Sequence, residues 1–300
     1  MTLTNKNVHH TGQGVPTFQE NAERVRLWNV PQPFRPSGTP ESESVPARVL
    51  LAEDNMIAQA YIRRLLERQG LEVVCAANGH EAVERFDNGR YSLVMLDILM
   101  PDMDGFEVAS MIREKERQGG GGQTPVIALT SYSLKAVKDK CRSVGMNGFL
   151  SKPVSDNDLR MLFAGLRGNG ADQHPGSGGA DSAVELALLD VQGSLDNLGG
   201  DLDLYREIVG MFVESAPEIV QGIVAALETG ELVLAGQHAH NLKGMAANIG
   251  AQRLADIASI IQNSVGMTPD GSCQPWILRL REEFENVTAA LAAVGEAPAP

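Results

Sequence analysis

The sequence predicts two domains of different fold class: an α/β domain with a doubly wound parallel sheet of five strands, then an all-α four-helix bundle. Three observations lead to this prediction. Between residues 47 and 167, short apolar runs alternate five times with longer amphipathic stretches. From residue 184 to about residue 294, the strand patterns stop and only helical spacing remains. Between these parts, residues 168–183 are dominated by Gly, Ser and Asp, the composition of a flexible linker.

The strands of the first domain are short apolar or β-branched runs that end in polar residues. They cover residues 48–54, 72–77, 92–97, 125–130 and 148–152. Helical spacing covers residues 56–70, 80–89, 106–118, 135–145 and 155–167. Strands that alternate with helices imply a parallel sheet with helices on both faces. In such sheets, ligands bind at the carboxyl ends of the strands.

The second domain shows four helical stretches joined by short connections, which indicates an antiparallel bundle. The stretches cover residues 204–227, 232–250, 251–265 and 275–294.

Residues 1–46 show no hydrophobic period, and residues 31–46 are rich in Pro, Ser and Glu. This composition is typical of an unfolded segment, so we expect a disordered N-terminal tail. Trp28 and Phe34 could anchor the tail to a partner, but a plain disordered lead is the favoured interpretation.

Composition limits the function further. A chain of 300 residues with 43% hydrophobic content can bury two ordinary cores. A formal net charge of −13 disfavours nucleic acid as a partner, because duplex binding depends on Lys and Arg. The three cysteines, Cys75, Cys141 and Cys273, are widely spaced among apolar residues, which indicates reduced thiols and a cytoplasmic protein. The N-terminus lacks the apolar core of a signal peptide, and no apolar run approaches the roughly 18 residues that a membrane span needs.

Polar residues interrupt the apolar strands at one predicted rim of the sheet. Glu53 and Asp54 end the first strand, Asp97 the third, Thr130 the fourth and Lys152 the fifth. Three adjacent carboxylates repel unless a divalent cation joins them, and an all-oxygen cluster suits Mg²⁺. A metal, a hydroxyl and an ammonium around one carboxylate stabilise charge on a phosphoryl group while that carboxylate attacks it. A lone Asp at a strand end is usually a turn or cap residue, but the five positions together favour a site.

The motifs LAEDN, LDILMPDMDG, ALTSY and FLSKP occur in this order within residues 47–167. With this spacing, the segment resembles the receiver domain of two-component response regulators, which has a flavodoxin-like fold. The resemblance implies that Asp97 is the phosphorylated residue. It also implies that Asp54 and Asp97 bind Mg²⁺ with the backbone carbonyl of Leu99, while Glu53 helps through water.

The same resemblance implies roles for three residues on the last two strands. Thr130 and Lys152 would hold the phosphoryl oxygens. Phe149 matches the aromatic residue that turns inward when a receiver switches, although simple packing explains an aromatic residue in a strand equally well.

Helical phase separates the two histidines of the predicted helix at residues 232–250. One stripe is apolar apart from its histidine, and we expect it to face the core; it comprises His238, Leu242, Met245 and Ile249. The opposite stripe comprises His240, Lys243, Gly244 and Ala247. His240 is therefore expected to point outward, where a histidine is most often merely solvated surface.

Its neighbours favour a function. Lys243 can neutralise a phosphoryl group on the ring, and Gly244 removes a side chain that would obstruct a docking protein. The sequence AHNLKGMAANIGA closely resembles the phosphoacceptor helix of histidine-phosphotransfer (HPt) domains, and LLDVQGSLDNLGGDLDLYREIVGMF resembles the start of such domains. The resemblance implies that His240 is phosphorylated, with Lys243 as its cationic companion.

We therefore predict a phosphorelay protein that uses Mg²⁺. Asp97 would accept a phosphoryl group from a sensor histidine kinase, and His240 would pass it to or from a receiver, its own or another protein's. The expected partners are that kinase and a downstream receiver or HPt protein. No ATP-binding element is visible, so we expect no kinase activity; the chain could be the tail of a hybrid sensor kinase or a free-standing protein.

Two alternatives remain open. Phosphorylation of Asp97 could switch a binding surface without onward transfer, or His240 could act as a phosphate sink. The linker would span roughly 20–25 Å on average as a flexible coil, which permits contact between Asp97 and His240 without requiring it.

Overall fold

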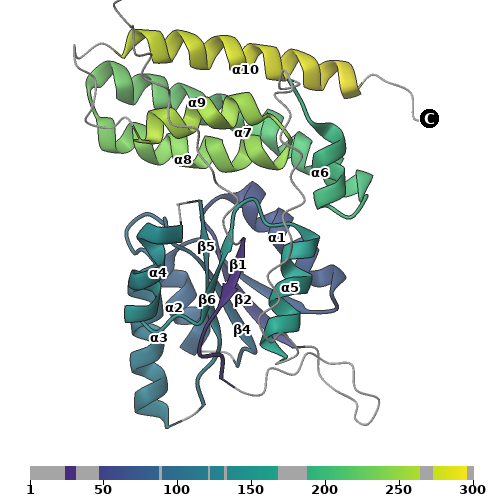
Figure 1. The fold of residues 1–300 in the computed structure, drawn as a ribbon. Helices are drawn as coiled ribbons and strands as arrows, with labels where there is room; N and C mark the ends of the chain where they lie inside the picture. The colour runs from purple at the N-terminus through teal and green to yellow at the C-terminus, as the bar shows by residue number, and fades with distance from the viewer. Residues whose placement is uncertain are drawn as a thin grey trace, which may run out of the picture.

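The computed structural model describes residues 24–31, 47–87, 90–120, 122–131, 134–167, 188–263 and 273–295. A sheet flanked by helices lies against a bundle of helices (Figure 1). The strands are β1 (Val25–Leu27), β2 (Arg48–Ala52), β3 (Glu72–Ala76), β4 (Leu93–Asp97), β5 (Val126–Thr130) and β6 (Gly148–Ser151). The helices of the sheet domain are α1 (Met56–Arg68), α2 (Gly79–Asp87), α3 (Gly105–Gly119), α4 (Leu134–Ser143) and α5 (Asp156–Leu166).

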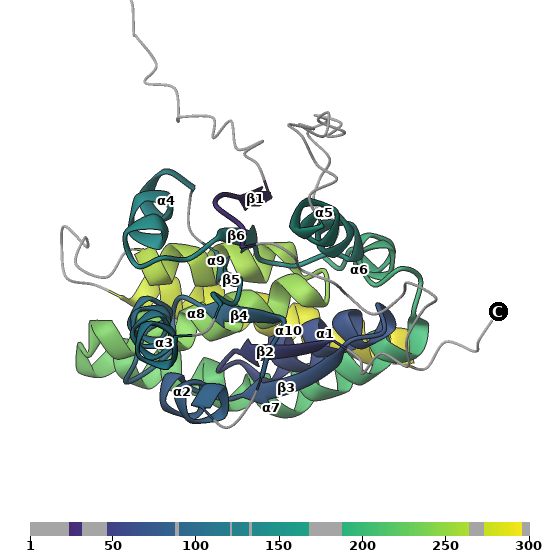
Figure 2. The same cartoon turned by 90° about the horizontal axis from the view of Figure 1, so that it is seen from below.

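The five predicted strands are confirmed as one parallel sheet. The order across the sheet is β1-β6-β5-β4-β2-β3, so β4, which ends at Asp97, lies inside the sheet. Every residue of β4 and β5 is buried, as expected for central strands covered on both faces. Seen along the sheet, α2, α3 and α4 lie on one side and α1 and α5 on the other (Figure 2). This doubly wound arrangement brings the carboxyl ends of β2, β4, β5 and β6 to the rim that faces the bundle.

One part of the expected disordered tail is ordered, which corrects that prediction. Residues Val25–Leu27 form β1, which adds an antiparallel sixth strand to the edge of the sheet at β6. Gly148 makes this pairing possible, because a Cβ there would lie 2.4 Å from the carbonyl oxygen of Arg26. The edge of β6 offered unpaired backbone groups, and β1 satisfies them. Residues 1–23 and 32–46, with Phe34, lie outside the described residues.

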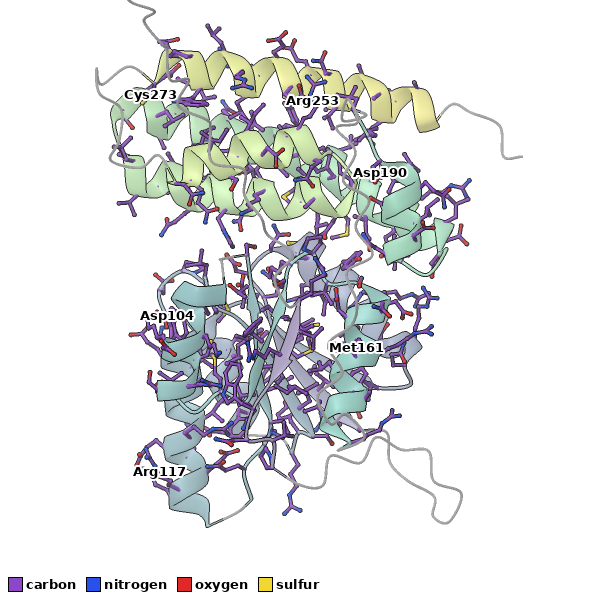
Figure 3. All side chains as sticks on the ribbon, viewed as in Figure 1. Asp104, Arg117, Met161, Asp190, Arg253 and Cys273 are labelled. Carbon is purple, nitrogen blue, oxygen red and sulfur yellow. The ribbon has the colours of Figure 1, made fainter. Side chains whose placement is uncertain are left out.

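The second domain is helical, as predicted. It contains α6 (Val191–Asn197), α7 (Leu202–Thr229), α8 (Leu232–Asn248), α9 (Gln252–Asn263) and α10 (Gln274–Gly295). The short helix α6 precedes the four that were predicted. Helix α8 packs between α7 and α9, and α10 covers α7 and α9 on the far side from the sheet domain. Arg253 on α9 (labelled in Figure 3) pairs with the buried Glu283 on α10 at 2.8 Å. The predicted linker at residues 168–183 lies outside the described residues.

Helix α7 is, among the residues that the structure describes, the one helix long and apolar enough to cross a membrane. Its sequence contains no unbroken apolar run of this length, because Glu214, Pro217 and Glu218 interrupt it. In the bundle, Ile208, Phe212 and other apolar residues of α7 are fully buried against neighbouring helices. A core position in the bundle therefore accounts for the length and composition of α7.

The three cysteines are free thiols, as the sequence predicted. Burial raises the pKa of the Cys141 thiol to about 11, which keeps it protonated and unreactive at neutral pH.

The two domains share one continuous cluster of buried apolar residues, which runs from α1 and α5 of the sheet domain into the bundle. Helix α1 contacts both α7 and α8, so it forms the centre of the contact between the domains.

Candidate functional site

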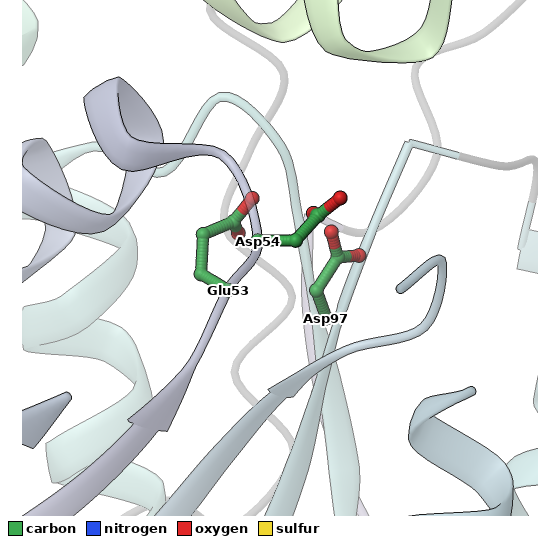
Figure 4. A group of neighbouring side chains, drawn as sticks. All are labelled: Glu53, Asp54 and Asp97. Carbon is green, nitrogen blue, oxygen red and sulfur yellow. The ribbon is translucent and has the colours of Figure 1, made fainter. Parts of the chain in front are cut away.

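Three carboxylates meet at the carboxyl ends of β2 and β4 (Figure 4). Glu53 and Asp54 directly follow β2, and Asp97 is the last residue of β4. One oxygen atom from each side chain lies within 4.8 Å of the other two. Glu53 and Asp97 are buried, with 1% and 2% of their surface exposed. The sequence placed these three residues at one rim, and the structure brings them together.

The turn that follows Asp97 holds the carboxylate in place. The backbone N–H of Leu99 donates to Asp97 Oδ1 at 3.2 Å. Helix α3 begins at Gly105, where a Cβ would lie 2.2 Å from the carbonyl oxygen of Asp97, so only glycine fits this close approach. Asp104 caps α3 in a reciprocal pair of hydrogen bonds with Glu107. The predicted role of the Leu99 carbonyl as a metal ligand stays a prediction.

Lys152 bridges two of the carboxylates. Its Nζ lies 2.6 Å from Glu53 Oε2 and 2.7 Å from Asp97 Oδ2, and only 9% of its side chain is exposed. Burial alone would lower the pKa of this lysine, but the charges of Asp97 and Glu53 outweigh burial and raise the pKa of Lys152 above its ordinary value of 10.5. The ammonium is therefore charged at every physiological pH, and it stands where a phosphoryl group on Asp97 would need a cation.

One lysine faces three acids, and the pKa values of Glu53 and Asp54 are both raised. Burial, and then the neighbouring Asp97, raise the pKa of Asp54 from 3.8 to about 6. Burial raises the pKa of Glu53 from 4.5 to about 8, partly offset by Lys152. Glu53 Oε1 and Asp54 Oδ1 are buried and accept no hydrogen bond from the described residues. Buried acceptors without donors, arranged as an all-oxygen cluster, fit a hard divalent cation such as Mg²⁺.

Thr130 and Phe149 lie on the two strands next to β4. Thr130 is the buried last residue of β5, and its carbonyl accepts from the backbone N–H of Lys152 at 2.8 Å. Phe149 on β6 is buried and packs against the indole of Trp28, with ring centroids 5.9 Å apart. Phe149 thus packs in the core, which fits both interpretations, and its role as a switch stays a prediction.

His240 lies directly opposite Asp97. Its Nε2 is 4.0 Å from Asp97 Oδ2, and the imidazole is only 11% exposed because the sheet domain covers it. The predicted helical phase is confirmed: Leu242, Met245 and Ile249 are buried in the bundle. His238 is half-buried against α7, where a Cβ on Gly222 would lie 3.0 Å from its Nε2.

Gln262 on α9 holds the ring of His240, a contact that the sequence analysis missed. The Gln262 side-chain amide lies 3.0 Å from His240 Nδ1. Burial lowers the pKa of His240 from 6.5 to about 4, although Asp97 partly opposes this effect. The imidazole is therefore neutral at neutral pH, as a nucleophile must be. Gln262 lies 22 residues from His240, and no sequence motif links them.

Asn55 connects the two domains beside Asp97 and His240. Its Oδ1 caps α1 by accepting from the backbone N–H groups of Ile57 and Ala58, and its Nδ2 donates to the carbonyl of Asn241 at 3.1 Å. Gly244 faces the same amide, but a Cβ there would lie 3.9 Å from Asn55 Nδ2, an ordinary contact. Alanine would therefore fit at position 244, and only a larger side chain would obstruct the docked domain.

A cavity of about 260 Å³ lies between the domains next to this site. Lys152 of the sheet domain and Lys243 of the bundle both line it. Lys243 contributes to the low pKa of His240, after burial and Lys152. Lys152 and Lys243 thus lie near Asp97 and His240, one in each domain.

The chain matches two family models and resembles several known proteins. Residues 49–164 match the family model of the response regulator receiver domain, and residues 207–290 match that of the Hpt domain. The signal transduction histidine-protein kinase BarA of Shigella flexneri is 30% identical over 257 residues, which cover 80% of this chain and 26% of that protein. The sensor histidine kinase GacS of Pseudomonas protegens is 28% identical over 84% of this chain and 28% of its own length.

Two solved structures also resemble parts of the chain. A complex from Saccharomyces cerevisiae, described as the histidine phosphotransfer protein Ypd1 with the receiver domain of Ssk1, gives a TM-score of 0.38 at 32% identity, over 39% of this chain and 86% of that chain. The receiver domain of the sensor histidine kinase PA1611 of Pseudomonas aeruginosa, described with a coordinated magnesium ion, gives 0.38 at 31% identity over 41% of this chain and 99% of that chain.

Residues 49–164 therefore belong to the response regulator receiver domain family, and residues 207–290 belong to the Hpt domain family. The relatives of the chain include sensor histidine kinases such as BarA and GacS, of which it spans about a quarter.

Proposed function

We propose that the chain exchanges a phosphoryl group between Asp97 of its receiver domain and His240 of its Hpt domain. The observation that carries this proposal is the distance of 4.0 Å between Asp97 Oδ2 and His240 Nε2 in a contact from which solvent is largely excluded. A phosphorus atom bonded to Oδ2 would lie between the two atoms, within reach of the ring nitrogen. Holding the two groups in this alignment supplies much of what phosphoryl transfer requires.

The transfer step needs only groups of this chain. The lone pair of His240 Nε2 attacks phosphorus, the bond from phosphorus to Asp97 Oδ2 breaks, and the carboxylate keeps the electron pair. In the structure, Gln262 Nε2 lies 3.0 Å from His240 Nδ1. The attack needs the tautomer with its proton on Nδ1, so the Gln262 amide would turn over to present its oxygen to that proton, which stays on the ring. Lys152, at 2.7 Å from Oδ2, stabilises the charge on the departing carboxylate. The reverse step uses the same groups.

Glu53, Asp54 and Asp97 would hold Mg²⁺, with the Leu99 carbonyl as a further ligand. When bound, the ion supplies positive charge next to the phosphoryl oxygens. The support for this part of the proposal is the set of buried carboxylate oxygens that lack hydrogen-bond donors. Thr130, at the buried end of β5, would donate its hydroxyl to a phosphoryl oxygen.

A sensor histidine kinase would supply the phosphoryl group to Asp97, and a second receiver or HPt protein would take it onward. A switched binding surface alone would give no reason for His240 to face Asp97, so the geometry favours the relay over that alternative. A phosphate sink would use the same internal step and would differ only in lacking an onward acceptor.

Labelling of the full chain tests the proposal. The protein is incubated with Mg²⁺ and ³²P-acetyl phosphate, which donates directly to receiver aspartates, and the label is assigned by its stability in acid or alkali. In the wild type we expect label on Asp97 first and on His240 later. His240→Gln should retain label on Asp97 only, and Asp97→Asn should carry none on either residue.

Removal of Mg²⁺ with EDTA should abolish the labelling of Asp97, and Asp54→Asn should do the same in the presence of the ion. His238→Gln is the matched control, because this half-buried histidine on the same helix packs against α7. It should leave the path of the label unchanged. The proposal fails if phosphorylated Asp97 never passes label to His240, or if Asp97→Asn still labels His240 from acetyl phosphate.

A further inference from the structure

The receiver and Hpt domains touch at both ends of α1, and the end far from Asp97 has no role in the chemistry proposed above. At the N-terminal end, Asn55 donates to Asn241 on α8, beside the reacting pair. At the C-terminal end, Arg68 contacts the turn between α6 and α7. Because α1 has 13 residues, the two contacts are separated by about 20 Å along the helix axis. Two contacts this far apart fix the angle at which the domains meet, which one contact cannot do.

The turn offers Arg68 two acceptors of different kinds. The guanidinium donates to the carbonyl of Leu198, at the end of α6, where backbone carbonyls have no partner within the helix. Its Nη1 also lies 3.9 Å from Asp201 Oδ2. Asp201 is itself held in place, because its Oδ1 caps α7 by accepting from the backbone N–H of Leu204 at 3.0 Å. The side chains of Arg68 and Asp201 are only 35% and 26% exposed.

A glycine of the turn lets its backbone approach the guanidinium closely. Gly199 has φ = 64°, a conformation that side chains disfavour, and a Cβ there would lie 2.9 Å from Arg68 Nη2. Gly200, with φ = 81°, completes the turn and brings Asp201 back towards the receiver domain. The turn thus has both the shape and the charge to accept an arginine.

We propose that the turn Leu198–Asp201 is a docking site for the arginine at the end of a receiver's first helix, and that it directs His240 to the receiver of its own chain. This inference rests on the proposed exchange between Asp97 and His240. The Arg68 contact would set the docking angle and raise the rate of internal transfer. It would also disfavour transfer to the Hpt domain of another chain.

Charge reversal in the full chain tests the docking site. Arg68→Asp places two carboxylates in contact, so we expect transfer from phosphorylated Asp97 to His240 to slow about tenfold, as the loss of a hydrogen bond to a charged group implies. Asp201→Arg should slow it similarly, and the double variant should recover most of the wild-type rate. Arg64→Asp is the matched control, because Arg64 is 56% exposed and its ion pair is with Glu67 of the same helix. All four variants should still accept label on Asp97 from acetyl phosphate.

A tagged acceptor chain carrying Asp97→Asn measures the specificity directly. In a mixture with phosphorylated wild type, little label should reach the tagged chain; with Arg68→Asp as donor, a larger share should reach it. Internal transfer at the wild-type rate in Arg68→Asp, or a double variant no better than the single variants, would overturn the proposal.

Small-angle X-ray scattering separates this inference from the proposed exchange. Arg68→Asp should expand the chain, and the double variant should restore the compact form. If the wild type never transfers label to His240, the exchange fails while scattering still decides whether Arg68 docks the domains. If transfer occurs and Arg68→Asp leaves both the rate and the scattering unchanged, only the docking site fails.

Discussion

At the residue scale, the reactivity of His240 depends on where the imidazole is buried. The receiver domain covers the ring, and burial lowers the pKa of His240 from 6.5 to about 4. Gln262 fixes the direction of the ring by its contact with Nδ1, which leaves Nε2 facing Asp97. A histidine that was solvated would be partly protonated near neutral pH and would point in many directions.

The low pKa predicts how docking responds to acid. Between about pH 4 and pH 6.5, an undocked imidazole binds a proton that the docked one does not, so docking should weaken as the pH falls through this range. Without Mg²⁺, the NMR signals of His240 should therefore report a neutral ring at about pH 5.5 while the domains remain docked.

Asp97→Asn should leave the His240 ring neutral at that pH, because Asp97 favours the protonated form. Arg68→Asp, which should separate the domains, should return the pKa of His240 towards 6.5. A pKa of His240 near 6.5 in the docked wild type would contradict this description of the site.

The sequence was sufficient for the residues whose position follows from a strand end or a helix face. Glu53, Asp54, Asp97, Thr130 and Lys152 meet because parallel strands end at one rim. Gln262, Asn55 and Arg68 could not be predicted in the same way. Each contacts a residue that is far away in the sequence or in the other domain. The local sequence around a polar side chain does not indicate such a distant partner.

At the element scale, the short strand β1 is held in place by its pairing with β6 at the edge of the sheet. Trp28 follows β1, packs on Phe149, and donates from Nε1 to the carbonyl of Met146 at 2.7 Å. Arg24 precedes β1 and pairs with the buried Asp158 at 2.9 Å. Three residues of strand surrounded by Pro-rich sequence show no periodicity, so the sequence could not reveal this element.

Trp28 should therefore stabilise the receiver domain. We expect Trp28→Ala to lower its free energy of unfolding by about 2 kcal/mol, the combined loss of one aromatic contact and one hydrogen bond. Trp28→Phe should recover the aromatic part only. Urea denaturation of the full chain measures both changes, with Val233→Ala as a control, because Val233 is 72% exposed on α8. Equal stability of Trp28→Ala and wild type would show that β1 does not hold the edge of the sheet.

At the scale of the whole molecule, the docked arrangement places the two proposed phosphate acceptors, Asp97 and His240, face to face and buries both. Asp97 is 2% exposed when the Hpt domain covers it. A kinase that phosphorylates Asp97 must therefore approach the same rim that the Hpt domain occupies, so loading and internal transfer require alternating contacts. The sequence could show that a linker of this length permits contact, but only the packing of α1 against α7 and α8 selects one arrangement.

The order of the transfer reaction tests the central claim most directly. The wild-type chain is phosphorylated on Asp97 and freed from the donor, and the appearance of label on His240 is followed at protein concentrations that span about a hundredfold. Because the two groups lie 4.0 Å apart in one chain, we predict a first-order rate constant that is the same at every concentration. A rate constant that rises in proportion to protein concentration would show that transfer occurs between chains, and it would contradict the account.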